Sequence, residues 1–201
     1  MEKFFKERVA EISSIAIALQ EQAEQFAKIV SIIEEVRRLG GKLFFCGVGG
    51  GAGNGTHAAG DLFKSCGIKA VCLTDNVPTL TAFTNDEGWP SVFEEQLRIW
   101  GLHNTDALFI FSVGGGDSKK NISANIVNAI DYAKECGAKI LGVVGKKTGH
   151  TANQANAVII VPNVNPDFLT THTEGMQSYI AHILTEALRK RSAKWESVEK
   201  K

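Results

Sequence analysis

Apolar residues recur every three or four positions over residues 3–39, a stretch that contains neither glycine nor proline. This spacing predicts one long amphipathic helix that ends at Gly40-Gly41. Its apolar seam comprises Val9, Ile12, Ala16, Leu19, Ala23, Phe26, Val30 and Ile33. A seam of this kind requires another helix against it. The partner is either an element of the same domain or, as we favour, a helix of another subunit.

From residue 42 onward, short apolar runs alternate with helical segments. Strands are expected at 42–46, 68–73, 106–111, 139–144 and 157–161. Helices are expected at about 55–66, 77–83, 91–100, 122–136, 148–154 and 173–191. Strands that are apolar throughout are typical of a parallel sheet covered on both faces. The alternation therefore predicts an α/β fold, a doubly wound five-stranded parallel sheet whose ligands bind beyond the carboxyl ends of the strands.

This pattern divides the chain into three parts. Residues 1–41 form an N-terminal helical segment for oligomerisation, and residues 42–191 form the α/β domain that carries the ligand site. Residues 192–201 read as a polar tail.

Composition excludes several classes of function. The chain has 201 residues, and its 22 Lys and Arg balance its 22 Asp and Glu, so no nucleic-acid surface is indicated. No apolar run approaches the roughly 18 residues of a membrane span. The four cysteines show no paired spacing, and the charged N-terminus does not read as a secretory signal. We therefore expect a cytoplasmic protein with reduced cysteines and no membrane partner.

A glycine-rich turn from Gly47 to Gly55 follows the first expected strand and precedes a helix that we place from about Thr56. Glycines let a backbone approach a ligand closely, and the free N–H groups of a helix start bind anions. Candidate phosphate-binding residues in this turn are Gly49, Gly50, Gly51 and Asn54. Within the helix, His57 and Asp61 are four residues apart and share one face. They form either a functional pair or an ordinary exposed ion pair.

A second glycine turn follows the third expected strand and leads into another helix. Its candidate phosphate-binding residues are Ser112, Gly114, Gly115, Ser118 and Ser123. Serine hydroxyls and backbone N–H groups at a helix start bind phosphate, and the neighbouring lysines would add charge. The alternative is a tight turn that only reverses the chain.

The first turn also fits the dinucleotide fingerprint, as Gly47-x-Gly49-x-x-Ala52, with Asp75 at the end of the next strand. A helix start near Gly55 is too late for that fingerprint, and a dinucleotide leaves the second turn unexplained. We therefore expect no nucleotide cofactor.

Several segments resemble SIS (sugar isomerase) domains, in particular the sedoheptulose-7-phosphate (phosphoheptose) isomerase group. Cys46-Gly-Val-Gly-Gly-Gly-Ala-Gly-Asn-Gly-Thr-His57 is similar to the first phosphosugar loop of that group. Thr84-Asn85-Asp86-Glu87-Gly88 looks like its Asn-Asp-x-Gly segment, which adds Asn85 and Asp86 as candidate substrate ligands. Ser123 to Ile130 and His182-Ile-Leu184 resemble two of its helices, so the resemblance covers nearly the whole chain.

The resemblance implies a homotetramer with active sites between subunits and an aldose–ketose isomerisation of a seven-carbon phosphosugar. The family's catalytic carboxylate and histidine fall on Asp61 and His182. Its metal-binding histidine falls on His57, and a glutamine of its last helix falls on Glu174. His57, Asp61, Glu174 and His182 thus all hold groups that could ligate a metal, and an N/O ligand set of this kind favours Zn²⁺. Glu174 and His182 are separated by about 12 Å of rise on a regular helix, so both reach one ion only if the helix start is irregular.

The sequence departs from the family at the phosphate site. Ser112-Val-Gly-Gly-Gly116 replaces Ser-Thr-Ser-Gly-Asn, Gly51 replaces a serine, Val48 an asparagine, and Ser65 an arginine. The phosphate site is therefore expected to be remodelled. A branch of the family without catalytic activity binds a replication initiator. A phosphosugar-binding or protein-interaction module is thus the alternative to an isomerase.

The remaining polar positions carry weaker signals. Met176, Ile180, Ile183, Leu184 and Leu188 form the apolar stripe of the last helix, and His182 lies off it. His182 is therefore expected either in solvent or facing a site. His103, His150 and His172 have no evident partner in the sequence and are expected at the surface.

Overall fold

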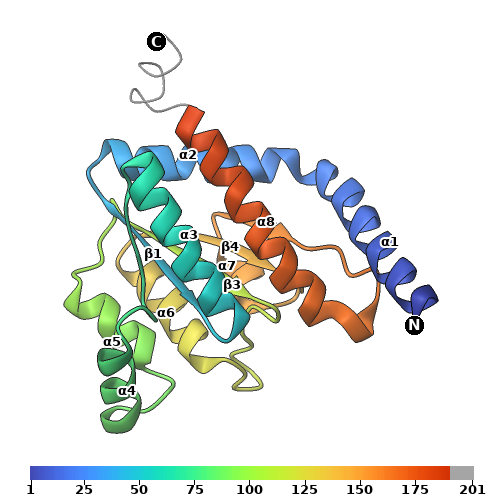
Figure 1. Cartoon of the computed structure of the whole chain (residues 1–201). Helices are drawn as coiled ribbons and strands as arrows, with labels where there is room; N and C mark the ends of the chain where they lie inside the picture. The colour runs from blue at the N-terminus through green and yellow to red at the C-terminus, as the bar shows by residue number, and fades with distance from the viewer. Residues whose placement is uncertain (191–201) are drawn as a thin grey trace.

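A computed structural model describes residues 1–190 of the chain and shows a three-layer α/β fold (Figure 1). Its five strands are β1 (Lys42–Gly47), β2 (Lys69–Cys72), β3 (Ala107–Ser112), β4 (Lys139–Val144) and β5 (Ala157–Ile160). All pairs are parallel, in the order β2-β1-β3-β4-β5. The predicted doubly wound sheet is confirmed: β2 is added on one side of β1, and β3, β4 and β5 are added on the other side, so the strand order reverses between β1 and β3.

Helices cover both faces of this sheet. They are α1 (Glu2–Leu19), α2 (Ala23–Arg38), α3 (Gly50–Cys66), α4 (Val77–Asp86), α5 (Val92–Ile99), α6 (Ala124–Glu135), α7 (His150–Gln154) and α8 (Leu169–Lys190). Residues on α2, α3 and α8 pack with Phe45, Phe109 and Phe111 on one face. Residues on α5 and α6 pack with Phe44, Leu108 and Ile110 on the other. Successive strand residues thus serve opposite cores, which explains the uniformly apolar strands.

The N-terminal helix is not one continuous rod, because a short 3-10 segment, Gln20–Gln22, separates α1 from α2. Gln22 leaves helical geometry, at φ −103° and ψ 15°. Its Nε2 donates to the carbonyl of Ile160 at 2.6 Å, and its Oε1 accepts from the N–H of Ile160 at 2.9 Å. Gln25 Oε1 accepts from the N–H of Val158 at 3.4 Å. The glutamines therefore satisfy the free edge of β5, which helix periodicity did not predict.

On the N-terminal side of this break, several apolar side chains of α1 are exposed to solvent. Phe5 is 59% exposed, Val9 64% and Ile12 47%. Ile15 and Leu19 are buried in the core that α2, α3 and α8 share. The first three turns of α1 thus present an apolar face that the described chain does not cover.

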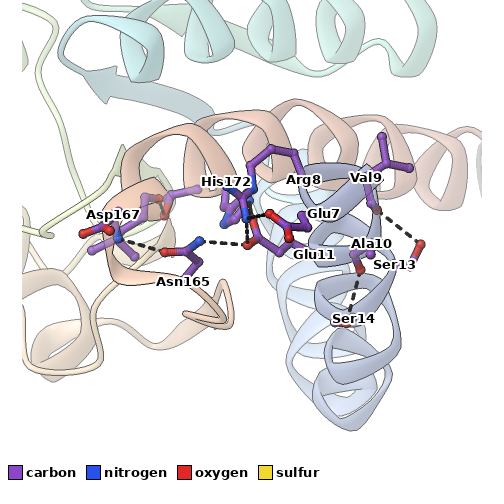
Figure 2. Close-up of polar contacts among 12 residues, drawn as sticks. Glu7, Arg8, Val9, Ala10, Glu11, Ser13, Ser14, Asn165, Asp167 and His172 are labelled. Carbon is purple, nitrogen blue, oxygen red and sulfur yellow. Dashed lines mark hydrogen bonds and ion pairs between the residues drawn. The ribbon is translucent and has the colours of Figure 1, made fainter. Parts of the chain in front are cut away.

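A partly buried polar cluster ties α1 to the start of α8, and Figure 2 shows its side chains converging. Glu11 accepts from Asn165 Nδ2 at 2.8 Å and from Arg8 at 2.6 Å. His172 Nε2 lies 3.1 Å from Glu11 Oε2. The Arg8 guanidinium also lies over the ring of Phe168, 4.5 Å from its centroid. His172 is only 7% exposed, so the expected surface position for this histidine was wrong.

His150 also differs from the expectation, because its side chain is 14% exposed and its Nε2 lies 2.7 Å from Asp131 Oδ1. His103 does lie at the surface, with a side chain that is 56% exposed. His150 and His172 both lie beside carboxylates of other helices, which a single-sequence pattern does not reveal.

The glycine turn after β1 has a specific steric role. α3 begins at Gly50, five residues earlier than predicted, after Gly49 at φ 59° and ψ −124°. A Cβ on Gly51 would overlap the carbonyl oxygen of Phe111, and a Cβ on Gly47 would lie 2.7 Å from it. The absence of side chains at Gly47 and Gly51 thus lets the start of α3 lie directly against β3.

The polar cluster on α1 gives a prediction about pH-dependent stability. The hydrogen bond from Asn165, helped by Arg8 and His172, holds the pKa of Glu11 below its ordinary value of 4.5. A lowered carboxylate pKa stabilises the fold above the unfolded-state pKa, and this stabilisation is lost as the pH falls through the folded-state pKa. Glu11→Gln should therefore lower the melting temperature at pH 7, and the difference from wild type should shrink below about pH 4.5.

Glu7→Gln is the matched control, because Glu7 lies on the same helix with a side chain that is 48% exposed. Its exposed contacts to Lys3 and Arg8 are both 3.8 Å and should add little stability. Equal melting temperatures for the Glu11→Gln and Glu7→Gln variants at pH 7 would contradict the structural role of Glu11.

The glycine turn gives a second prediction, from two glycines two residues apart in α3. Gly51→Ala should destabilise the protein, because its methyl group would meet the Phe111 carbonyl. Gly53→Ala should stabilise it by about 0.5–1 kcal/mol, because its methyl group meets nothing within 4 Å and alanine favours a helix. Urea unfolding measures both. A Gly51→Ala variant as stable as Gly53→Ala would rule out the close approach of α3 to β3.

Candidate active site

Two histidines and a carboxylate from facing helices meet on the outer side of α3 and α8. His57 Nε2 lies 3.2 Å from Asp61 Oδ2, and His182 Nδ1 lies 3.4 Å from the same oxygen. The two imidazole rings are 5.0 Å apart and meet edge to face. α3 supplies His57 and Asp61 one turn apart, and α8 supplies His182, which points away from its own apolar stripe. The structure brings these three predicted residues together, and their roles stay predictions.

The three side chains can hold a metal ion. Their ligand atoms all lie within 4.8 Å of one another. In a tetrahedral zinc site with bonds of about 2.0–2.1 Å, ligand atoms are about 3.3 Å apart. The contacts of Asp61 Oδ2 with both histidines are already close to that spacing. The set of two nitrogens and one oxygen is of a kind that binds zinc.

Glu174 is not part of this cluster. Its carboxyl group lies against Gly50 at the start of α3, where a Cβ on Gly50 would overlap it. A carboxylate at this position faces the positive end of the α3 dipole. The 3-10 turn Pro166–Phe168 leads into α8 at Leu169, so Glu174 lies on regular helix. The irregular helix start that a shared ion would require is therefore absent at Glu174.

Asn54 and Gln177 connect the same two helices on their inner side. Asn54 Nδ2 donates to the carbonyl of Glu174 at 2.8 Å and to Gln177 Oε1 at 3.3 Å. Gln177 Nε2 donates to the carbonyl of Val143 on β4 at 3.0 Å. The placement of Asn54 among phosphate-binding residues stays a prediction, although its amide nitrogen already serves two acceptors. Gln177 was unassigned, yet a glutamine beside Met176 and Ile180 on an apolar stripe signals a buried polar contact.

The second glycine turn lies beyond the carboxyl end of β3. Ser112 Oγ accepts from the N–H of Gly115 at 3.0 Å. Gly115 has φ +74°, and a Cβ there would lie 3.3 Å from Thr151 Cβ. Gly114 has open space where its Cβ would project. The backbone conformation therefore explains why position 115 is a glycine. Steric packing does not explain the glycine at position 114, because a side chain there would meet no other atoms.

The segment after these glycines forms a small hairpin. Asp117 and Ile122 pair through both backbone groups, and Asp117 Oδ1 accepts from the N–H groups of Lys119 and Lys120. Ser118 is exposed in this hairpin. Ser123 has φ 51° immediately before α6, and its side chain makes no capping bond. A left-handed serine at a helix start is strained, a feature that often accompanies ligand binding.

A pocket of about 150 Å³ lies between this turn and the loop after β4. Its lining residues include Gly114, Gly116, Lys120, Lys146 and Thr148. Asn85 and Asp86 lie at the end of α4, where Asn85 Nδ2 donates to Asp86 Oδ1 at 2.8 Å and both side chains are exposed. Their predicted contact with a substrate stays a prediction.

One argument against a bound dinucleotide was wrong, and the structure supplies a different one. The late helix start was wrong, because α3 begins at Gly50. However, Asp75 is engaged within the protein. Its Oδ1 accepts from Thr56 Oγ1 at 2.5 Å, and its Oδ2 accepts from the N–H of Cys72 at 3.2 Å. The Glu174 carboxylate against the start of α3 further disfavours a diphosphate there.

The cysteines take no part in this chemistry. All four are free, and burial raises the pKa of Cys46, Cys66 and Cys72. These thiols stay protonated and serve as packing groups. Within residues 1–190, no helix has the length and apolar character of a membrane span.

Comparison with known proteins agrees with this architecture. The model of the SIS domain matches residues 5–145. The phosphoheptose isomerase of Rhodospirillum rubrum is 31% identical over 173 residues, which cover 84% of this chain and 86% of the relative. The lincomycin biosynthesis protein LmbN of Streptomyces lincolnensis is 35% identical over 154 residues, 74% of this chain. That match spans only 56% of the length of LmbN.

Solved structures resemble the chain over almost its full length. A phosphoheptose isomerase from Francisella tularensis superposes with a TM-score of 0.83 at 20% identity, covering 95% of this chain and 99% of that one. The phosphoheptose isomerase GmhA from Neisseria gonorrhoeae gives a TM-score of 0.75 at 25% identity, covering 92% and 99%. The fold, the family match and the relatives together lead to one conclusion: this chain belongs to the SIS domain family, in its phosphoheptose isomerase group.

Proposed function

We propose that the protein is a phosphosugar aldose–ketose isomerase of the sedoheptulose 7-phosphate type, which acts through an enediol. The observation that carries this proposal is the position of Asp61 Oδ2, between His57 Nε2 and His182 Nδ1 on two facing helices. A carboxylate and an imidazole side by side supply the base and the acid that an isomerisation needs. Membership of the SIS domain family and the names of its relatives support the choice of substrate class.

The proposed reaction moves one carbon-bound proton. Asp61 takes a proton from C1 of the ketose while His182 donates a proton to the oxygen on C2, which gives the enediol. His182 then takes the hydroxyl proton from the oxygen on C1, and Asp61 returns a proton to C2, which gives the aldose. Asp61 can serve as the base because its Oδ1 makes no hydrogen bond within the described part of the chain, whereas Oδ2 faces both histidines.

His57, Asp61 and His182 would hold a zinc ion in this proposal, with Glu174 outside the ligand set. A zinc ion with an open position polarises a carbonyl oxygen as a Lewis acid. His57 has no other role in the proposed proton transfers, so its contribution is to the ion and to the orientation of Asp61.

The phosphate group would bind at the turn from Ser112 to Ser123, with the first glycine turn, Gly49 to Gly51, bordering the sugar. The pocket beside Gly114, with Lys120 and Lys146 in its lining, supports this assignment. Lysine side chains would add a charge that a serine-only loop lacks.

We also propose a homotetramer in the cytoplasm, with residues 1–41 as its helical oligomerisation segment and residues 42–191 as the catalytic domain. The exposed apolar face of α1, with Phe5, Val9 and Ile12, supports the assembly, because monomers rarely leave such a helix face in solvent. The last part of the proposed domain, residue 191, and the predicted polar tail, 192–201, lie outside the described residues.

Solvent deuterium exchange tests the proposed activity directly. The protein should incorporate deuterium at C1 of recovered sedoheptulose 7-phosphate and at C2 of the aldose product, because the enediol exchanges its proton with solvent. Binding of the sugar phosphate without exchange into it or into shorter ketose phosphates would sink the isomerase proposal and favour a binding module.

Variants of the two proposed proton carriers give the first catalytic prediction. Asp61→Asn and His182→Gln should each lower kcat by about 10²-fold or more, the usual scale of general acid–base catalysis. Sugar-phosphate affinity should change much less, because other residues hold the phosphate. His103→Gln is the matched control, since its side chain is 56% exposed against 52% for His182. His57→Ala should weaken zinc binding, and excess zinc should restore part of the activity.

The phosphate turn gives a prediction that separates binding from folding. Gly114→Val should place its side chain in open space beside the 150 Å³ pocket. We expect it to weaken sugar-phosphate binding about 10-fold or more, which corresponds to about 1.4 kcal/mol, with unchanged thermal stability. Gly115→Val is unsuitable alone, because its φ of +74° and its contact with Thr151 would strain the fold. If calorimetry gave the Gly114→Val variant the same sugar-phosphate affinity as wild type, the proposal that the phosphate binds in this pocket would be wrong.

A further inference from the structure

Two amides, Asn54 and Gln177, lie behind the His57–Asp61–His182 cluster, on the side of α3 and α8 that faces the sheet. Asn54 is one helical turn before His57, and Gln177 precedes His182 by five residues in α8. Gln177 is 0% exposed. A buried amide is retained only where hydrogen bonds compensate for the loss of water.

The orientation of each amide is fixed by a main-chain carbonyl, which can only accept a hydrogen bond. Gln177 Nε2 donates to the carbonyl of Val143 at 3.0 Å, which turns Gln177 Oε1 toward α3. Asn54 Nδ2 donates to the carbonyl of Glu174 at 2.8 Å and to Gln177 Oε1 at 3.3 Å. Turning either amide over would place an oxygen against a carbonyl oxygen. The chain from Asn54 through Gln177 to β4 therefore has one consistent arrangement.

This arrangement fixes how α8 lies along α3. A slide of α8 by one residue, about 1.5 Å, would break the contacts of Asn54 with both acceptors. The same slide would move His182 relative to Asp61, whose contact is 3.4 Å. The packing residues of the two helices include alanines, among them Ala58 and Ala181, which have few features to resist sliding. The amides supply the specific register that small apolar side chains lack.

We infer that Asn54 and Gln177 are positioning residues that set the register of α3 against α8 and thereby assemble the His57–Asp61–His182 site. This inference rests on the proposed function for its catalytic consequences, but the geometric claim does not depend on turnover. Within residues 1–190, neither amide makes a side-chain hydrogen bond to the three site residues, so both act through the helices that carry them. The inference gives Asn54 a role different from phosphate binding.

The most specific probe is Asn54→Asp, which keeps the shape of the side chain and replaces its donor with an acceptor. An aspartate cannot donate to the Glu174 carbonyl or to Gln177 Oε1. Asn128→Asp is the matched control, because Asn128 Nδ2 also donates to a main-chain carbonyl, that of Pro90 at 3.1 Å, far from the site in the fold. For the second amide, Gln177→Met pairs with Gln96→Met, because Gln96 is also a buried glutamine, bonded within α5.

Three measurements separate positioning from general stability. Zinc affinity should fall about 10- to 100-fold in Asn54→Asp and Gln177→Met, the usual effect of changing groups that orient metal ligands. The loss should appear in kcat rather than in KM, because the phosphate turn is untouched. Gln177→Glu in the same assays should recover little, since its carboxylate cannot donate to the Val143 carbonyl. Asn128→Asp and Gln96→Met should leave zinc affinity and kcat within about twofold, whatever they cost in melting temperature.

The third measurement is independent of the proposed function. Ring protons of His57 and His182 should give a nuclear Overhauser effect in wild-type protein, since the ring centroids are 5.0 Å apart. The effect should weaken in Asn54→Asp and persist in Asn128→Asp. If wild type neither binds zinc nor isomerises the sugar, the proposed function fails while this comparison still decides the positioning role. An unchanged effect in Asn54→Asp would overturn the inference, as would losses of zinc affinity equal to those of the controls.

Discussion

The close approach of α3 to β3 is the constraint on which the rest of the site depends. Gly47 and Gly51 have no side chains at the two points where Cβ atoms would meet the carbonyl of Phe111. α3 can therefore start beside the carboxyl end of β3 and lie next to α8 on the same face of the sheet (Figure 1). From that position His57 and Asp61 face outward at the height of His182. A bulkier first turn would tilt α3 and separate the histidines.

The site takes its precision from regular elements rather than from loops. All three members of the cluster lie on helices whose inner faces are packed in one core with the sheet. Asn54 and Gln177 add directional contacts between these helices and β4. Residues held by packed helices keep a fixed geometry more readily than residues on mobile segments. The half-exposed outer side of the cluster leaves space for a fourth ligand or a substrate.

Charge is arranged around the helix starts in two different ways. At α3, the Glu174 carboxylate already faces the positive end of the helix dipole, so this start is poorly suited to a second anion. Before α6, Lys120 of the preceding hairpin and Lys146 of the loop after β4 line an open pocket together with Asp117, whose Oδ1 accepts from the N–H groups of Lys119 and Lys120. The two lysines support the proposal that the second turn, rather than the first, binds the phosphate. The Glu174 carboxylate also explains why a glycine-rich turn after β1 need not bind a dinucleotide.

Local patterns in the sequence determined the strands, the alternation with helices and the candidate residues His57, Asp61 and His182. Such patterns depend on side-chain periodicity and on turn residues, which one segment contains by itself. Contacts between distant segments decided the rest. The break at Gln20–Gln22, where Gln22 pairs with the edge of β5, depends on residues 138 apart. The burial of His172 depends on Glu11 in another helix, and the early start of α3 depends on the carbonyl of Phe111. The register that joins Asp61 to His182 likewise exists only after folding, because hydrogen bonds between α3, α8 and β4 set it.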